Sequence, residues 1–294
     1  MSILLALALL CAILPTASLR ASAATTSGTC GDNLIWSFDS STGTLTIEGS
    51  GKMNDYYGYE DMSAPWYDWI DSIKKITIGN SVTSIGRLAF GACTSLTSVT
   101  IGNSVTSIGE AAFWNCTSLT SVTIPESLTS IGVAAFSACN SLTKITVASG
   151  NPNYCSDSHG VLFNKNKTKL IQFPGGYQGS YAIPSSVTSI GNHAFSNCES
   201  LTSVTIPNSV TSIGAWAFCD CTALTSVTIP NSVTSIGDGT FYRYTSLTSV
   251  TIGNSVTSIG DRAFYCCDSL TKITVASGNP NYCSDSHGVL FNKS

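Results

Sequence analysis

A pattern of leucine, valine, isoleucine, phenylalanine and cysteine returns every 23 residues along most of this chain. Residues 96–118, LTSVTIGNSVTSIGEAAFWNCTS, show it in full. Two series of the step are marked by Cys93, Cys116 and Cys139, and by Cys198, Cys221, Tyr244 and Cys267. Repeats of roughly 20 to 50 residues are typical of arrays whose units bury their apolar faces against one another. We therefore expect stacked coils in place of a globular core.

Each repeat predicts two short extended segments. Val99 and Ile101 alternate with Ser98 and Thr100, which is the pattern of a half-buried strand. A turn at 102–104 precedes a second extended arm at 105–108, and residues 109–118 are expected to close the coil with about one helical turn. The fold class predicted is a mainly β solenoid of parallel strands with short helical turns.

The first 72 residues do not follow the repeat. Residues 1–23 contain an apolar run, a proline and small residues, which predicts a secretory signal peptide, with no transmembrane segment once it is removed. Residues 24–72 are expected to form an N-terminal cap, with a β-hairpin at 33–47. Its aromatic residues are predicted to roof the first coil, although a binding surface is the alternative: Tyr56, Tyr57, Tyr59, Trp66, Tyr67 and Trp69.

The repeat array is expected to occupy residues 73–294, with one irregular and longer unit at 142–200. Residues 270–293 repeat 142–165 letter for letter, so 270–294 is an incomplete copy of that unit. We expect the chain to be a fragment of a longer array or to have a poorly capped end.

The twelve cysteines do not suggest a disulfide framework, because most fall at one repeat position. A buried thiol there acts as a small apolar group in the stacked core. The cysteines outside this position are the better candidates for disulfide bonds: Cys30, Cys155, Cys219, Cys266 and Cys283.

Residues that would support catalysis are few. The histidines are His159, His193 and His287, and the sequence has no zinc-protease, serine-hydrolase or phosphate-binding motif. Cys219 and Cys221 lack further partners at ligand spacing, and the polar loop at 151–160 lacks the spaced carboxylates of calcium loops. We therefore predict no enzyme activity, no metal and no cofactor.

Charged residues make up 10% of the chain, and the net charge is −4 without any basic block, which argues against a nucleic-acid partner. The candidate binding surface is the outward side of the first strand in each repeat. Its predicted residues are Ser98, Thr100, Ser121, Thr123, Lys144, Thr146, Ser203, Thr205, Ser226, Thr228, Ser249 and Thr251. Such rows suit an extended protein or glycan. The alternatives are a structural spacer and, less well matched because Ser or Lys holds the paired position, an ice-binding surface.

The recurring motif Leu-x-x-Val-x-Ile-Pro/Gly-x-x-Val-x-x-Ile-Gly-x-x-Ala-Phe-x-x-Cys-x-Ser resembles the BspA-type leucine-rich repeat family from about residue 73 onward. Residues 27–33 and 63–67 are similar to the region that often precedes such arrays. The resemblance implies a leucine-rich-repeat solenoid in a secreted or cell-surface protein. It also implies host or bacterial surface proteins or glycans as partners, and no catalysis.

Overall fold

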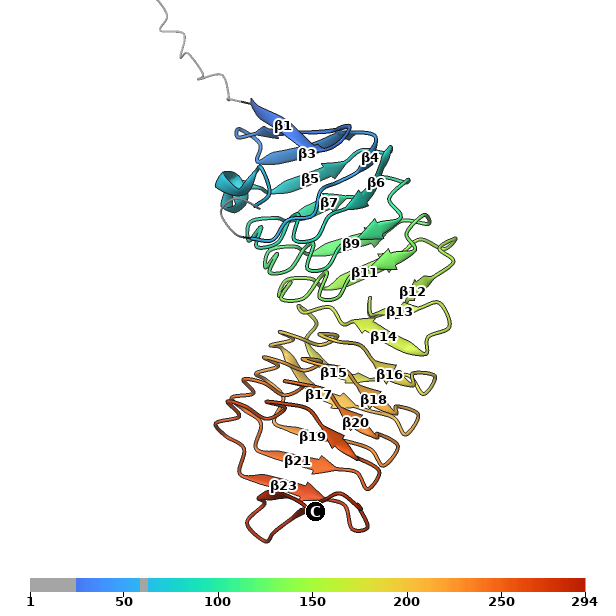
Figure 1. Cartoon of the computed structure of the whole chain (residues 1–294), viewed down its shortest axis with the longest axis vertical. Helices are drawn as coiled ribbons and strands as arrows, with labels where there is room; N and C mark the ends of the chain where they lie inside the picture. Colours follow the sequence, from blue (N-terminus) through green and yellow to red (C-terminus); the bar gives the residue numbers. More distant parts are fainter. Residues whose placement is uncertain (1–24, 59–62, 294) are drawn as a thin grey trace, which may run out of the picture.

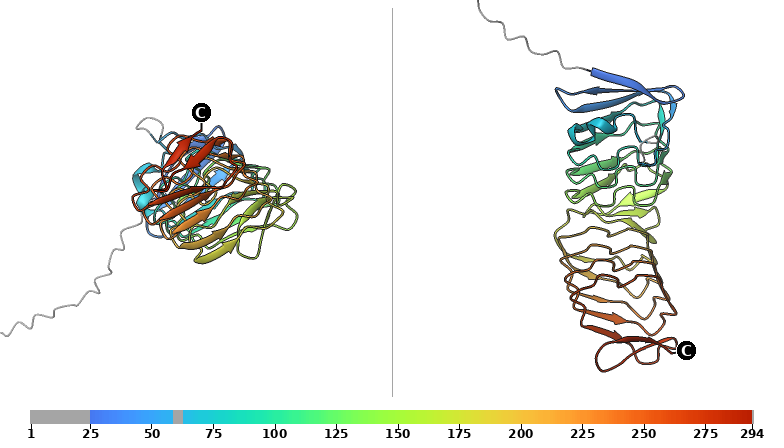
Figure 2. Two further views of the ribbon diagram at one scale, coloured as in Figure 1. Left: turned by 90° about the horizontal axis from the view of Figure 1, so that it is seen from below. Right: turned by 60° about the vertical axis from the view of Figure 1, so that its left-hand side comes forward.

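The computed structural model describes residues 25–58 and 63–293, which form an elongated stack of coils (Figures 1 and 2). The first described residues lie at one end of the stack and the last at the other. The predicted signal peptide and Tyr59 lie outside the described residues. Within the described ranges, no helix is long and apolar enough to cross a membrane.

The N-terminal end is closed by three antiparallel strands, β1 (Thr25–Gly31), β2 (Leu34–Asp39) and β3 (Thr44–Gly49). The predicted hairpin is confirmed as β2 and β3, and β1 adds a strand outside it. β3 then pairs in parallel with β5 (Lys75–Ile78). The cap therefore covers the strand edge that the first coil would otherwise leave open.

The aromatic residues of the cap divide into two groups. Trp66 is 1% exposed, stacks on Phe90 at 5.4 Å and donates its indole N–H to the Ala89 carbonyl at 2.9 Å. Trp36 contacts both Trp66 and Trp69, which begins the roof over the first coil. Tyr57 and Tyr67, the latter in the 3-10 helix η2 (Tyr67–Ser72), are about half exposed. The roof is thus formed by the tryptophans and not by every aromatic residue of the segment.

Two sides of the stack are built from strands in register, and the core lies between them. The first strand of each coil is β5, β7 (Ser98–Thr100), β9 (Ser121–Ile124), β11 (Lys144–Val147), β15 (Gly179–Ala182), β17 (Leu201–Thr205), β19 (Ser226–Thr228), β21 (Ser249–Ile252) or β23 (Lys272–Val275). The second is β4 (Gly51–Lys52), β6 (Val82–Ile85), β8 (Ser107–Ile108), β10 (Ser130–Ile131), β14 (Lys169–Gln172), β16 (Ser189–Ile190), β18 (Ser212–Ile213), β20 (Ser235–Ile236) or β22 (Ser258–Ile259).

The third side of the coil, which we call the turn side, differs from the expected helical turn. Ala111 and Asn115 have left-handed φ angles of 53° and 58°. The amide of Ala112 bonds back to Gly109, whereas the amides of Ala111 and Phe113 donate to carbonyls of the next coil at 3.0 and 2.9 Å. A helix would satisfy its amides within its own coil, so this alternation is what lets the turn side join neighbouring coils.

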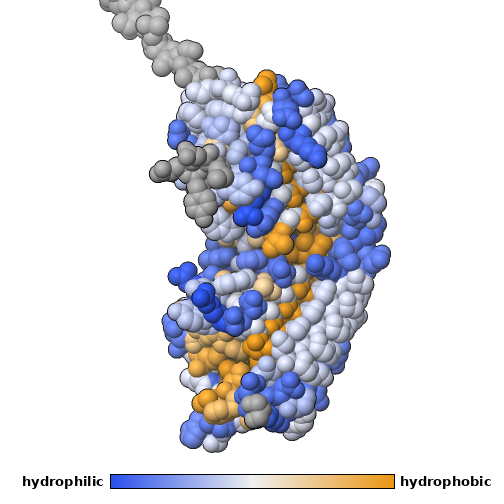
Figure 3. Space-filling model, in the orientation of Figure 1, coloured by the Kyte–Doolittle hydropathy of each residue, from blue (hydrophilic) through white to orange (hydrophobic). Residues whose placement is uncertain are grey.

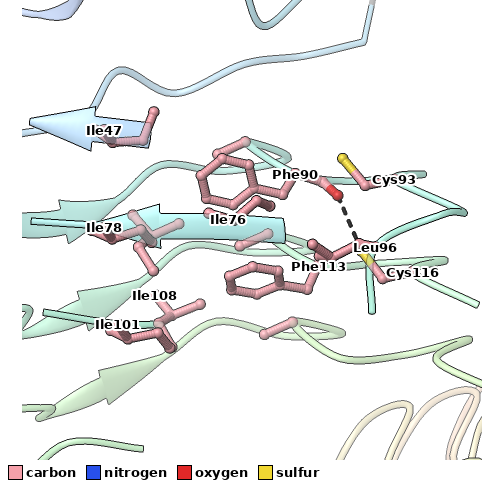
Figure 4. Packing of buried hydrophobic residues seen from close by; sticks show 14 of the residues in the cluster. Ile47, Ile76, Ile78, Phe90, Cys93, Leu96, Ile101, Ile108, Phe113 and Cys116 are labelled. Carbon is pink, nitrogen blue, oxygen red and sulfur yellow. Dashed lines mark hydrogen bonds between the residues drawn. The ribbon is translucent and has the colours of Figure 1, made fainter. Parts of the chain in front are cut away.

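Phenylalanine rings form the axis of the core. Trp66, Phe90, Phe113 and Phe136 stack with ring centroids 5.3 to 5.5 Å apart. Figure 4 shows Phe90 and Phe113 one above the other, with the Cys116 thiol donating to the Phe90 carbonyl at 3.2 Å. Each coil lies close to the next at its corner, where a Cβ atom on Gly109 would lie 2.4 Å from the Arg87 nitrogen. Only glycine permits this approach.

The irregular unit interrupts this axis. Strands β12 (Tyr154–Ser156), β13 (Leu162–Asn164) and β14 pair antiparallel before the parallel stack resumes at β16. A second ring stack begins at Phe173 and continues through Phe195, and the buried residues accordingly form two clusters. The chain therefore consists of two regular halves joined by an antiparallel segment.

The repeated segment takes the same local structure twice, with β24 (Tyr282–Ser284) and β25 (Leu290–Asn292) corresponding to β12 and β13. Its burial differs. Val161 and Phe163 are fully buried, whereas Val289 and Phe291 are 50% and 46% exposed. β13 is covered by pairing with β14, and β25 has no such partner among the described strands.

The ring stack predicts a large difference between two adjacent residues. Phe113→Ala should lower the free energy of unfolding by about 3–5 kcal/mol, because it leaves a cavity between Phe90 and Phe136. The matched change Trp114→Ala, at a side chain 43% exposed, should cost much less. Urea denaturation followed by circular dichroism measures both. Equal costs would show that the ring stack does not hold the coils together.

Candidate functional site on the outward strand face

The twelve residues predicted to face outward from the first strands lie on one side of the stack. Ten of them are exposed, and Thr146 and Ser249 are half-buried. The side chains between them, such as Val122 and Ile124 on β9, point into the core. The period-two alternation thus separates a buried face from a polar one, as the sequence indicates.

Strand pairing aligns these residues into rows. Thr77 is in register with Thr100, Thr123 with Thr146, and Thr228 with Thr251. Parallel strands lie about 4.8 Å apart, so each row is a series of hydroxyl groups at that spacing. A neighbouring row contains Ser226 and Ser249, followed by Lys272.

Threonine has two different uses in the repeat. The Thr97 hydroxyl donates to the carbonyl of Lys74 at 3.0 Å, and the Thr106 hydroxyl donates to that of Thr83 at 3.0 Å. Their equivalents in other coils repeat these bonds, as in Thr143 and Thr211. In contrast, none of the twelve candidate side chains has a hydrogen bond or ion pair with another residue of the described ranges. Their polar groups remain available to a ligand.

The rows do not run without interruption along the whole array. The amide of Ile145 on β11 donates to Gly160 of the irregular loop, at the place where a regular coil would supply its next strand. The following strand, β15, carries Ala182 opposite Thr205. The structure therefore brings the candidate residues together in two groups, one on each half of the stack.

A hollow of about 620 Å³ opens on the N-terminal group. Thr100 and Thr123 lie in its lining, together with Asn103 and Glu126. Figure 3 shows the wider surface of the molecule, where hydrophobic residues gather in a band along its length and strongly hydrophilic residues are scattered. The hollow is the place on the outward face where a ligand would find both hydroxyl and carboxylate groups.

Sequence reasoning missed the members of these rows that lie outside the twelve. Thr46 of the cap pairs in register with Thr77, Lys75 pairs with Ser98, and Thr274 with Thr251. The signal was present, since residues 44–47 have the same alternation as the repeats. The hydroxyl row thus begins on the cap itself.

The polar loop of the irregular unit serves the fold. The Asp157 carboxylate accepts hydrogen bonds from the amides of His159 and Val161, and from the Tyr181 hydroxyl at 2.8 Å. Burial raises the pKa of Tyr181, and its bond to Asp157 raises it further. The buried Asn151 amide likewise bonds two carbonyls of the preceding coil. These contacts occupy the oxygen atoms that a calcium ion would need.

The remaining titratable groups are dispersed. His193 stacks on Trp216, and its burial lowers its pKa. Across the described ranges, no three His, Cys, Asp or Glu side chains come together as metal ligands. Every cysteine between 25 and 293 is a free thiol, including the five considered for disulfide bonds. Burial raises the pKa of Cys93 to about 12 and that of Cys30 to about 11, so these thiols are core groups and poor nucleophiles.

Comparison with known proteins gives a consistent result. The family described as BspA type Leucine rich repeat region matches residues 63–179 and 177–286, in six copies. A solved leucine-rich repeat protein from Eubacterium ventriosum is 26% identical, with a TM-score of 0.59 and 86% of each chain covered. No curated protein sequence matches significantly.

Two further solved structures share the fold at lower identity. A leucine rich cell surface protein from Faecalibacterium prausnitzii is 24% identical, with a TM-score of 0.51, and covers 87% of this chain and 96% of its own. The pneumococcal vaccine antigen PcpA is 19% identical, with a TM-score of 0.54, and the match covers 85% of this chain and 88% of the antigen.

The buried thiols predict how stability depends on pH. Cys93 has a pKa near 9.0 when unfolded and about 12 when folded, chiefly because of burial and then because of the nearby Asp71 charge. Between these values the unfolded chain releases a proton that the folded chain keeps, so the free energy of unfolding falls as pH rises. The slope for this thiol is about 1.4 kcal/mol per pH unit.

Urea titrations between pH 8 and pH 11 should therefore show a shallower decline for Cys93→Ala than for the natural chain. Near pH 8 the difference between the two proteins should be constant, since both thiol states are protonated there. Parallel curves at alkaline pH would contradict the assignment of Cys93 as a core thiol.

Proposed function

Since the chain belongs to the BspA-type leucine-rich repeat family, we propose that it is a secreted or cell-surface binding protein that acts without catalysis. Its ligand is an extended protein or glycan on a host or bacterial surface. The predicted signal peptide supports secretion, and the cell-surface description of the Faecalibacterium structure is in keeping with it.

The observation that carries the proposal is the division between bonded and free hydroxyls. Thr97 and Thr106 spend their hydroxyls on the neighbouring coil, whereas Thr100 and Thr123 leave theirs free on the outward face. A row of free donors and acceptors at a fixed spacing is suited to a ligand that itself repeats along its length. A linear polysaccharide or an extended polypeptide has that property.

The chemistry of the rows favours a ligand that is neutral or weakly acidic. Serine and threonine both donate and accept hydrogen bonds, so they match hydroxyl and amide groups equally well. The charged members of the rows are lysines, namely Lys75, Lys144 and Lys272. Glu126 at the edge of the hollow adds a carboxylate that can accept hydrogen bonds from sugar hydroxyls.

A spacer that holds another region away from a surface is the second candidate. The observation in its favour is the elongated stack, in which each coil contacts mainly its neighbours. A spacer needs no ligand on its outward face, so the two functions differ in one measurable respect.

The triple variant Thr100→Glu, Thr123→Glu and Thr205→Glu tests the binding face. It should weaken adherence to immobilised extracellular-matrix proteins or to glycans by about tenfold or more, because added carboxylates remove donors and repel acidic groups. Biolayer interferometry on a matrix-protein panel and a glycan array measures this.

The matched control is Ser107→Glu, Ser130→Glu and Ser258→Glu on the second strands. Like the test set, it places two new carboxylates on adjacent coils and one on a distant coil, so its effect on folding should be similar. Adherence that survives the threonine changes would exclude the outward face as the site. Indifference of the natural chain to every ligand on both panels would favour the spacer.

A further inference from the structure

The backbone ladder of the turn side is broken where the two halves meet. In the coil at 109–116 the amides of Ala111 and Phe113 donate to the next coil, and His193 and Phe195 do the same in the second half. The equivalent amides of Ala134 and Phe136 have no acceptor among the described residues. Only in the last regular coil do Arg262 and Phe264 also lack one. Buried amides are rarely left without a partner.

A groove of about 470 Å³ lies beside these two amides. One wall consists of residues 131–136, and the other contains Ile171, Gln172 and residues 189–192. Its size lies within the range of roughly 300 to 1,000 Å³ that is usual for ligand-binding clefts. The groove exists because the antiparallel strands of the irregular unit replace the coil that would otherwise stack on residues 131–136.

The opposite wall offers an acceptor. Gln172 is 95% buried, since its exposed fraction is 5%, and its amide nitrogen donates to the Phe173 carbonyl at 3.1 Å. Its amide oxygen has no donor within the described ranges. The groove thus has backbone N–H groups on one side and a free carbonyl-type oxygen on the other, which is the complement of a peptide group.

The charge and polarity of the lining narrow the choice of ligand. Lys169 is the one charged residue that lines the groove, and it has no ion pair in the described parts of the chain. Val133, 49% exposed, and Ile171 provide apolar walls. In every intact coil the acceptor for the amides at this position is a polypeptide carbonyl.

We propose that this groove binds an extended peptide segment of a partner protein, with small or aliphatic side chains and one acidic residue near Lys169. Carbonyl groups of the peptide accept from the Ala134 and Phe136 amides, and one of its amides donates to Gln172. The peptide takes the place of the missing coil, as strand addition does at a sheet edge. This surface is separate from the outward hydroxyl rows.

Selection of a random nonapeptide display library on the whole chain tests the proposal. Ala134→Trp should fill the groove, since Trp216 occupies the same repeat position with a φ of 56°, against 57° for Ala134, and covers Gly239 of the next coil. We expect enriched peptides to bind Ala134→Trp at least about tenfold more weakly than the natural chain. Arg262→Trp, at the same repeat position in the last regular coil, is the matched control and should leave binding unchanged.

Amide hydrogen exchange supplies a second measurement on the unmodified chain. A bound peptide should slow exchange at Ala134 and Phe136, whereas Ala111 and Phe113, already bonded, should change little. Acidic residues should recur at one position of the enriched peptides. Failure to enrich any peptide, equal binding to Ala134→Trp, or protection confined to the first strands would overturn the proposal. The triple threonine variant should still bind these peptides, which separates this result from the fate of the outward face.

Discussion

Hydrogen bonding between the backbones of successive coils is the interaction on which this structure depends. Two sides of each coil bond as parallel strands, and the third bonds through amides that alternate between their own turn and the next coil. No coil can satisfy these groups alone, so each is stable only when stacked. Phenylalanine rings and thiols then fill the space that the stacked backbone encloses. The same dependence explains why a break in the stack creates both a second core and a groove.

Much of the fold could be predicted because its physical causes are local and repeated. Alternation of Val99 and Ile101 with polar neighbours defines a half-buried strand in every copy, and the step of 23 residues predicts parallel stacking. The turn side could not be predicted in the same way. Phe113 and Cys116 have helical spacing, yet their backbone adopts left-handed turns because the amides are needed by the neighbouring coil. That requirement arises only after stacking and leaves no distinct pattern in one repeat.

The candidate site shows a similar division. The outward position of Thr100 and its equivalents follows from strand alternation, so it could be predicted. The difference between Thr100 and Thr97 could not, since both are threonines in the same short segment and only the carbonyl of the preceding coil distinguishes them. The groove at the junction was also beyond prediction. It depends on how the irregular unit meets residues 131–136, which are far away in the sequence.

The segment that occurs twice, letter for letter, shows how such an array can grow. Asp157 and Asp285 make the same bonds within their loops, and both loops bond back to the preceding first strand, so a duplicated block carries its local geometry with it. Burial is not inherited in this way, because Phe163 and Phe291 differ in exposure according to the strand beside them. Gene duplication can therefore lengthen the chain without redesign of its loops, while selection on apolar residues depends on the unit that follows.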